Sequence, residues 1–134
     1  MQIGIIGFGR FSELMARYLS KDFEVRIATR KDRREDIQRV GALQVPLEEV
    51  CALGQVILSV PISAMKGVLL DIAPLLKPGT TVMDVCSVKE YPVRLMKDLL
   101  PESVSLLPTH PLFGPDSAAE SLSGKKIVLC RERI

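Results

Sequence analysis

Aromatic side chains are scarce in this sequence of 134 residues, and tryptophan is absent. Two tyrosines and four phenylalanines leave few rings on which nucleobases could stack. The formal net charge of +2 is also too small to indicate a nucleic acid or a membrane surface as a partner. We therefore expect the chain to bind neither.

The three cysteines do not fit a disulfide framework or a zinc site. Cys51, Cys86 and Cys130 are an odd number, lie far apart and form no Cys-x-x-Cys pair. The N-terminus has no basic leader, and no apolar run approaches the length of about 18 residues that a membrane span requires. The sequence thus predicts free thiols in a reducing environment and a cytoplasmic protein without a metal.

Short apolar runs alternate with segments of helical period along the whole chain. The runs predict strands at residues 3–6, 23–28, 43–45, 56–60, 81–85, 104–107 and 127–130. The helical spacing predicts helices at residues 11–19, 33–40, 47–53 and 63–76, and one that ends near residue 100. Such alternation gives right-handed βαβ units and a mostly parallel sheet with helices on both faces. The predicted fold is α/β, a doubly wound Rossmann-type sheet in a single dinucleotide-binding domain over residues 1–134.

A glycine-rich turn joins the first predicted strand to the first predicted helix. It reads Gly7-Phe8-Gly9-Arg10-Phe11-Ser12. Gly7 permits a tight turn, Gly9 lets the backbone approach a pyrophosphate, and position 12 needs a small residue so that helix and strand can pack closely. The helix N-terminus would then present N–H groups to the phosphates. We expect residues 7–11 to bind a dinucleotide; alternatively, the glycines serve only the turn.

The stretch after the second predicted strand bears on the choice between NAD and NADP. It reads Ala28-Thr29-Arg30-Lys31-Asp32-Arg33-Arg34. An NAD site usually places a carboxylate here to hold the ribose hydroxyls, whereas Thr29 can donate a hydrogen bond and Arg30 can bind a 2′-phosphate with its planar guanidinium. We assign Thr29, Arg30 and Lys31 to the cofactor and favour NADP over NAD. The alternative is a solvated helix start, although four cations there oppose the helix dipole.

Polar or rigid groups follow three other strands, at the edge where a doubly wound sheet binds its ligands. These segments are Ser59-Val60-Pro61, Cys86-Ser87-Val88-Lys89 and Thr109-His110-Pro111. His110 is the only histidine, and imidazole exchanges protons near neutral pH, which makes it a candidate base. Each segment alone is also compatible with residues that simply end a strand and begin a loop. Together they outline a cleft.

Three segments give the sequence a resemblance to the prephenate/arogenate dehydrogenases of tyrosine biosynthesis. They are residues 5–11, residues 84–90 with the Ser-Val-Lys motif, and residues 109–117, which read THPLFGPDS. The second and third are much more specific than the glycine loop, and the resemblance covers nearly the whole chain. It implies an enzyme that oxidises and decarboxylates a cyclohexadienol, prephenate or arogenate, to an aromatic ring and passes hydride to a nicotinamide cofactor.

The resemblance also implies roles for individual residues. His110 would accept the proton of the ring hydroxyl while hydride leaves the same carbon, a task that suits an imidazole. Ser87 would hydrogen-bond in the same region and align the reacting groups. Val60 and Pro61, with Ser59 beside them, would pack near the ribose and nicotinamide, and Lys89 would either reach a substrate carboxylate or lie at the surface.

Members of this family carry a second, helical domain, which we expect to be absent from residues 1–134. The resemblance implies that this domain forms a homodimer and closes the substrate site, so the chain alone is not expected to turn over substrate. The residues that distinguish prephenate from arogenate are expected there. Two other interpretations stay open, namely a nucleotide-binding or regulatory module without turnover of its own, and another NADP-dependent reductase of similar topology.

Overall fold

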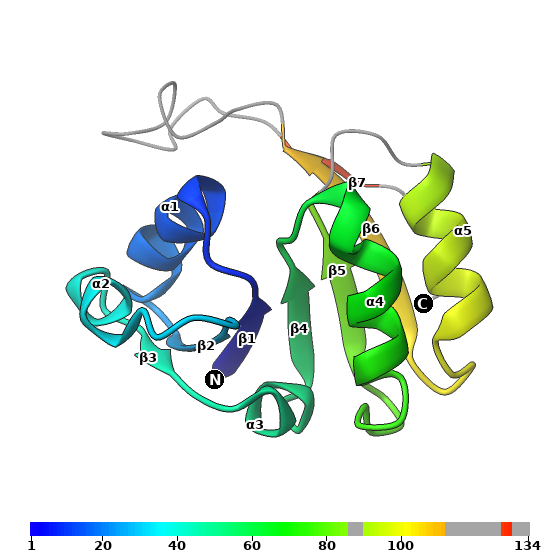
Figure 1. Cartoon of the computed structure of the whole chain (residues 1–134), viewed down its shortest axis with the longest axis horizontal. Helices are drawn as coiled ribbons and strands as arrows, with labels where there is room; N and C mark the ends of the chain where they lie inside the picture. The colour runs from blue at the N-terminus through cyan, green and yellow to red at the C-terminus, as the bar shows by residue number, and fades with distance from the viewer. Residues whose placement is uncertain (86–89, 112–126, 130–134) are drawn as a thin grey trace.

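The computed structural model describes residues 1–85, 90–111 and 127–129 of the chain, and within them seven strands form one sheet (Figure 1). The strands are β1 Gln2–Ile6, β2 Glu24–Ala28, β3 Leu43–Gln44, β4 Gln55–Leu58, β5 Thr81–Asp84, β6 Ser105–Pro111 and β7 Ile127–Leu129. Their order is β3-β2-β1-β4-β5-β6-β7; the first six are parallel and β7 is antiparallel to β6. This order confirms the doubly wound sheet, and β1 and β4 are the neighbours at which the chain changes direction across it.

The helices lie on both faces of the sheet. In the described part of the chain they are α1 Arg10–Leu19, α2 Arg34–Arg39, α3 Leu47–Cys51, α4 Ile62–Ile72 and α5 Glu90–Leu99. Figure 1 shows α4 and α5 side by side along one face, whereas Ala16 of α1 and Ile37 of α2 are buried in the core on the other face. No helix among these five is long and apolar enough to cross a membrane.

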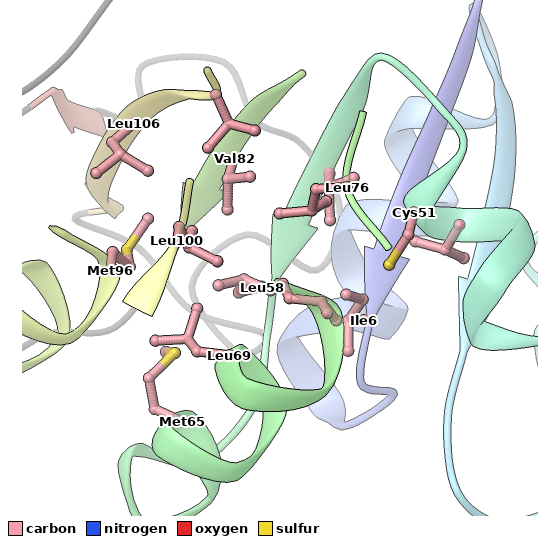
Figure 2. Close-up of a cluster of buried hydrophobic side chains, with 14 of the residues drawn as sticks. Ile6, Cys51, Leu58, Met65, Leu69, Leu76, Val82, Met96, Leu100 and Leu106 are labelled. Carbon is pink, nitrogen blue, oxygen red and sulfur yellow. The ribbon is translucent and has the colours of Figure 1, made fainter. Parts of the chain in front are cut away.

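Alternate strand residues contribute to two separate cores. Ile6 and Leu58 pack with Met65 and Leu69 of α4 in the larger core, which Figure 2 shows. The strand residues that alternate with these, such as Ile5 beside Ile6, pack on the opposite face with side chains of α1 and α2. Burial on both faces explains why residues 3–6 and 56–58 are apolar without alternation.

Helix α4 is shorter than its apolar spacing predicts. It ends at Ile72, four residues before the expected end at residue 76. The cause is Pro74, which has no N–H group to continue the hydrogen bonding of the helix, although Ala73 before it still has helical dihedral angles. Leu76 is nevertheless buried, and its N–H donates to the Ile72 carbonyl in a turn that follows the helix.

Strand β6 is longer than the prediction of residues 104–107. Its first four residues pair with β5, and the last three pair with β7 in the opposite direction. His110 lies in this second part, opposite Val128. It is therefore past the end of the parallel ladder, as expected, but it belongs to a strand rather than to a loop. The physical reason is that β7, a distant segment, supplies the pairing partner.

Candidate functional site

A pocket of about 460 Å³ lies where β1, β2 and β4 end. The glycine loop forms one wall, and the segments that follow β2 and β4 form two others. Its lining, among residues the structure describes, comprises Ile6, Gly7, Phe8, Gly9, Ala28, Thr29, Arg30, Lys31, Arg33, Ser59, Val60, Pro61, Ala64 and Val68. The pocket is thus at the carboxyl edge of the sheet, beside the β1–β4 switch point where such folds bind ligands.

The glycine loop is held tightly between two strand ends. Gly7 has a φ of +100°, and a Cβ atom there would overlap the carbonyl oxygen of Ser59 and lie 2.9 Å from a methyl carbon of Val60. The Gly7 N–H donates to the Ala28 carbonyl at 2.8 Å, and the Ser59 N–H donates to the Ile6 carbonyl at 2.9 Å. Only glycine therefore fits at position 7, and the loop has one well-defined path.

Gly9 leaves open space at the beginning of α1. It is the N-cap residue, no side chain caps the helix, and a Cβ atom at Gly9 would meet nothing within 4 Å among the described residues. An uncapped helix N-terminus next to open space suits a phosphate, since the end of the helix dipole is positive there. Ser12 is fully buried, as expected for the position that needs a small residue.

The segment after β2 brings positive charge to the pocket. Thr29, Arg30, Lys31 and Arg33 line it, and neither aspartate nor glutamate is among its described lining residues. The Arg33 guanidinium lies 5.0 Å from the centroid of the Phe8 ring, a distance at which the cation is attracted to the ring face. The pocket therefore favours an anion at this end.

The one acidic residue of this segment is paired with a cation. Asp32 accepts hydrogen bonds from the Arg34 side chain at 2.8 and 3.0 Å and from its main-chain N–H at 3.1 Å. These bonds lower the pKa of Asp32 to about 2 and raise the pKa of Arg34. Both side chains are exposed, and neither residue is part of the pocket lining given above. The carboxylate thus does not offset the charge of the pocket.

The pocket unites most of the predicted cofactor residues. Arg10 and Phe11 are the exceptions, because they lie in the first turn of α1 and do not line it. The prediction missed the last residues of β1 and β2, Ile6 and Ala28, and also Arg33, Ala64 and Val68. Arg33 belongs to the basic cluster that the sequence shows, whereas Ala64 and Val68 have only the four-residue spacing of one helix face as a signal.

Of the two predicted catalytic residues, Ser87 lies outside the described residues, as do Lys89, Cys86, Cys130 and residues 112–117. His110 is placed by its main chain in β6. Next to it, the hydroxyl of the buried Thr109 donates to the main-chain carbonyl of Asp84 at 2.7 Å and ties β6 to the end of β5. The strand that precedes Ser87 and the strand of His110 are therefore neighbours.

Cys51 shows no sign of reactivity or metal binding. It is a free thiol in the larger core, and burial, with a smaller contribution from Glu48, raises its pKa to about 11. A thiol of such high pKa is a weak nucleophile because little thiolate is present near neutral pH. No cluster of three potential metal ligands occurs in residues 1–85, 90–111 and 127–129.

The parallel sheet, the glycine turn at its switch point and the basic pocket together define a Rossmann-type nucleotide-binding domain. A family profile described as prephenate dehydrogenase, nucleotide-binding domain, matches residues 16–133. The chain belongs to this family. Because the match begins at residue 16, it does not depend on the glycine loop.

Curated relatives have related names but are much longer. The chain is 31% identical over 119 residues to the probable arogenate/prephenate dehydrogenase of Methanocaldococcus jannaschii, with 85% of the chain and 26% of the relative covered. It is 31% identical to arogenate dehydrogenase 1, chloroplastic, of Arabidopsis thaliana (100% and 22% covered), and 30% identical to the probable prephenate dehydrogenase [NADP(+)] of Schizosaccharomyces pombe (98% and 32% covered). The chain thus spans only about a fifth to a third of these relatives.

Solved structures confirm the fold. The crystal structure of Synechocystis arogenate dehydrogenase superposes with a TM-score of 0.81 at 22% identity, over 98% of this chain and 50% of the other. Prephenate dehydrogenase of A. aeolicus, in complex with hydroxyphenyl propionate and NAD+, gives 0.75 at 22% identity, over 98% and 51%.

Proposed function

We propose that this chain binds NADP and is the cofactor-binding part of a prephenate or arogenate dehydrogenase. The observation that carries the proposal is the basic pocket at the end of β2, which Thr29, Arg30, Lys31 and Arg33 line; Arg33 is paired with Asp36, which is not among the described lining residues. A 2′-phosphate matches these donors, whereas the diol of NAD is usually held by a carboxylate. The name of the S. pombe relative includes NADP(+), although the A. aeolicus complex contains NAD+.

The other walls of the pocket suit the rest of a dinucleotide. The main chain of residues 7–11 would hold the pyrophosphate, because Gly9 leaves space at the uncapped N-terminus of α1. Ser59, Val60 and Pro61 would lie against the ribose and nicotinamide at the end of β4. When bound, the cofactor would accept hydride from the substrate.

His110 and Ser87 are proposed to act on the substrate farther along the same edge. Strands in a sheet are about 4.8 Å apart, so β6 lies about 14 Å from β1, three spacings away, which an extended dinucleotide can cover. His110 would accept the proton of the ring hydroxyl, and Ser87 would align that hydroxyl with the base. Loss of CO2 would make the ring aromatic, so the protein mainly supplies alignment and a base.

The cofactor assignment is tested by calorimetric titration of the chain with NADP and NAD. We expect tighter binding of NADP, and Arg30→Asp should reverse or abolish this preference because its carboxylate repels the 2′-phosphate. Lys77→Asp, an equal charge change at an exposed position outside the pocket lining, is the matched control. An unchanged NADP-to-NAD ratio in Arg30→Asp would show that the assignment is wrong.

The base is tested with His110→Asn in the longest natural polypeptide that contains this sequence. We expect a large loss of kcat with NADP binding retained, because asparagine keeps hydrogen bonding but cannot accept the proton. Near-normal turnover would rule out His110 as the base. If the parent protein binds NADP but produces no NADPH absorbance with prephenate or arogenate, a regulatory nucleotide-binding module becomes the better explanation.

A further inference from the structure

The side chain of Gln44 holds the basic segment after β2 at two points. Gln44 ends the short strand β3, and its main chain pairs with Ile27 of β2. Its amide oxygen accepts a hydrogen bond from the main-chain N–H of Arg33 at 2.8 Å, and its amide nitrogen donates to the main-chain carbonyl of Lys31 at 2.9 Å. One half-buried side chain thus supplies the partners that regular secondary structure would otherwise provide.

The amide group of Gln44 suits this task in a way that similar side chains do not. A main-chain N–H needs an acceptor and a carbonyl needs a donor, and the carboxamide offers both at once. Glutamate would turn an acceptor toward the carbonyl of Lys31, and methionine would keep the size of the side chain but make neither bond. The chemistry of residue 44, and not only its volume, therefore matches the segment.

The segment held by Gln44 carries the cations of the pocket. Arg30, Lys31 and Arg33 have like charges that repel one another, so an unanchored segment would adopt many conformations. Arg33 is held by its side chain as well, between the ring of Phe8 and the Asp36 carboxylate, which accepts a hydrogen bond from Nε at 3.0 Å. Because folding already holds these cations in place, binding of the nucleotide does not have to pay the entropic cost of ordering them, and the affinity is higher.

We propose that Gln44 is a positioning residue that sets the selectivity for nucleotides with a phosphate on the adenosine ribose. The inference rests on the proposed NADP function and adds the residue that directs the cations toward that phosphate. Binding of NAD should depend little on Gln44, because the path of the glycine loop is set by other bonds, those of Gly7 with Ala28 and of Ser59 with Ile6.

The inference is tested with Gln44→Met, which keeps the size of the side chain and removes both hydrogen bonds. The matched control is Gln38→Met, the same change at an exposed position of α2. Calorimetry on the folded chain gives Kd for NADP and NAD, and for the smaller pair adenosine 2′,5′-bisphosphate and 5′-AMP. We expect Gln44→Met to weaken NADP and the bisphosphate about tenfold and NAD and 5′-AMP less than twofold, with no change in Gln38→Met.

Equal weakening of both nucleotides would mean that Gln44 only supports the fold, and unchanged Kd values would mean that it does not position the cations; either result overturns the inference. If Gln44→Met does not fold, Gln44→Glu keeps the bond to Arg33 and is expected to show at least the same selective loss. If the chain without substitutions binds NADP no better than NAD, the proposed cofactor preference is wrong, and this inference is wrong with it.

Discussion

The two glycines of the turn should fail in different ways when each is replaced by alanine. Gly7→Ala places a Cβ atom on a residue with a φ of +100°, which costs about 1–2 kcal/mol for an L-amino acid. The same atom overlaps the carbonyl oxygen of Ser59, and relief of such overpacking typically costs about 1–3 kcal/mol. The free energy of unfolding should therefore fall by about 2–5 kcal/mol.

Gly9→Ala should lower stability much less than Gly7→Ala. Its φ is −109° and no described atom lies within 4 Å of the added Cβ, so only the weaker N-cap preference of alanine remains, and the loss should stay below about 1 kcal/mol. The methyl group would, however, stand where we propose that the pyrophosphate approaches α1. We expect NADP affinity to fall at least about tenfold, or about 1.4 kcal/mol.

Thermal and urea denaturation measure the first effect, and calorimetric titration with NADP measures the second. For a chain of this length a loss of about 3 kcal/mol lowers Tm by about 10 °C. Gly54→Ala, at a glycine before β4 where an added Cβ also meets nothing among the described residues, is the control that should change neither quantity. The φ of Gly7 alone should cost at least about 1 kcal/mol, so a Gly7→Ala variant whose free energy of unfolding falls by less than that would refute the role of Gly7 in the loop. A Gly9→Ala variant that binds NADP normally would refute the role of Gly9.

Three further changes test other parts of the structure. Gly67→Ala, in the exposed interior of α4 with open space around it, should raise the free energy of unfolding in urea by about 1 kcal/mol; a decrease would contradict the described helix. Arg34→Ala should raise the Asp32 pKa from about 2 toward 3.8 in an NMR titration. The stabilisation that the ionised Asp32 gives above its unfolded pKa, and loses as pH falls toward 2, should then become smaller, since only the bond from the main-chain N–H of residue 34 remains; an unchanged pKa would show that the Arg34 side chain is not its cause. Thr109→Val removes the hydrogen bond to Asp84 and should lower the free energy of unfolding in urea by about 1 kcal/mol, whereas Thr109→Ser keeps the hydroxyl and should retain most of the stability. An equal loss of stability in both variants would assign the effect to packing.

The local sequence pattern was sufficient to predict most of the fold. The apolar runs at residues 3–6 and 56–60, the second interrupted only by Ser59, indicate strands buried on both faces, and they correspond to β1 and β4 at the centre of the sheet. The glycine turn likewise follows from its own residues, since the conformation that Gly7 needs is a property of the backbone. These features depend on neighbours in sequence, so the sequence alone predicts them.

Contacts between distant segments decided the rest. His110 is in a strand because β7 pairs with it. The pocket includes Arg33 but not Arg34, because Gln44 and Phe8 hold the first while Asp32 pairs with the second. A charge count reveals how many cations are present, but their directions depend on partners that only folding brings close. The sequence by itself determined the sheet, the glycine turn and the sign of charge at the pocket; the tertiary structure decided which side chains face it.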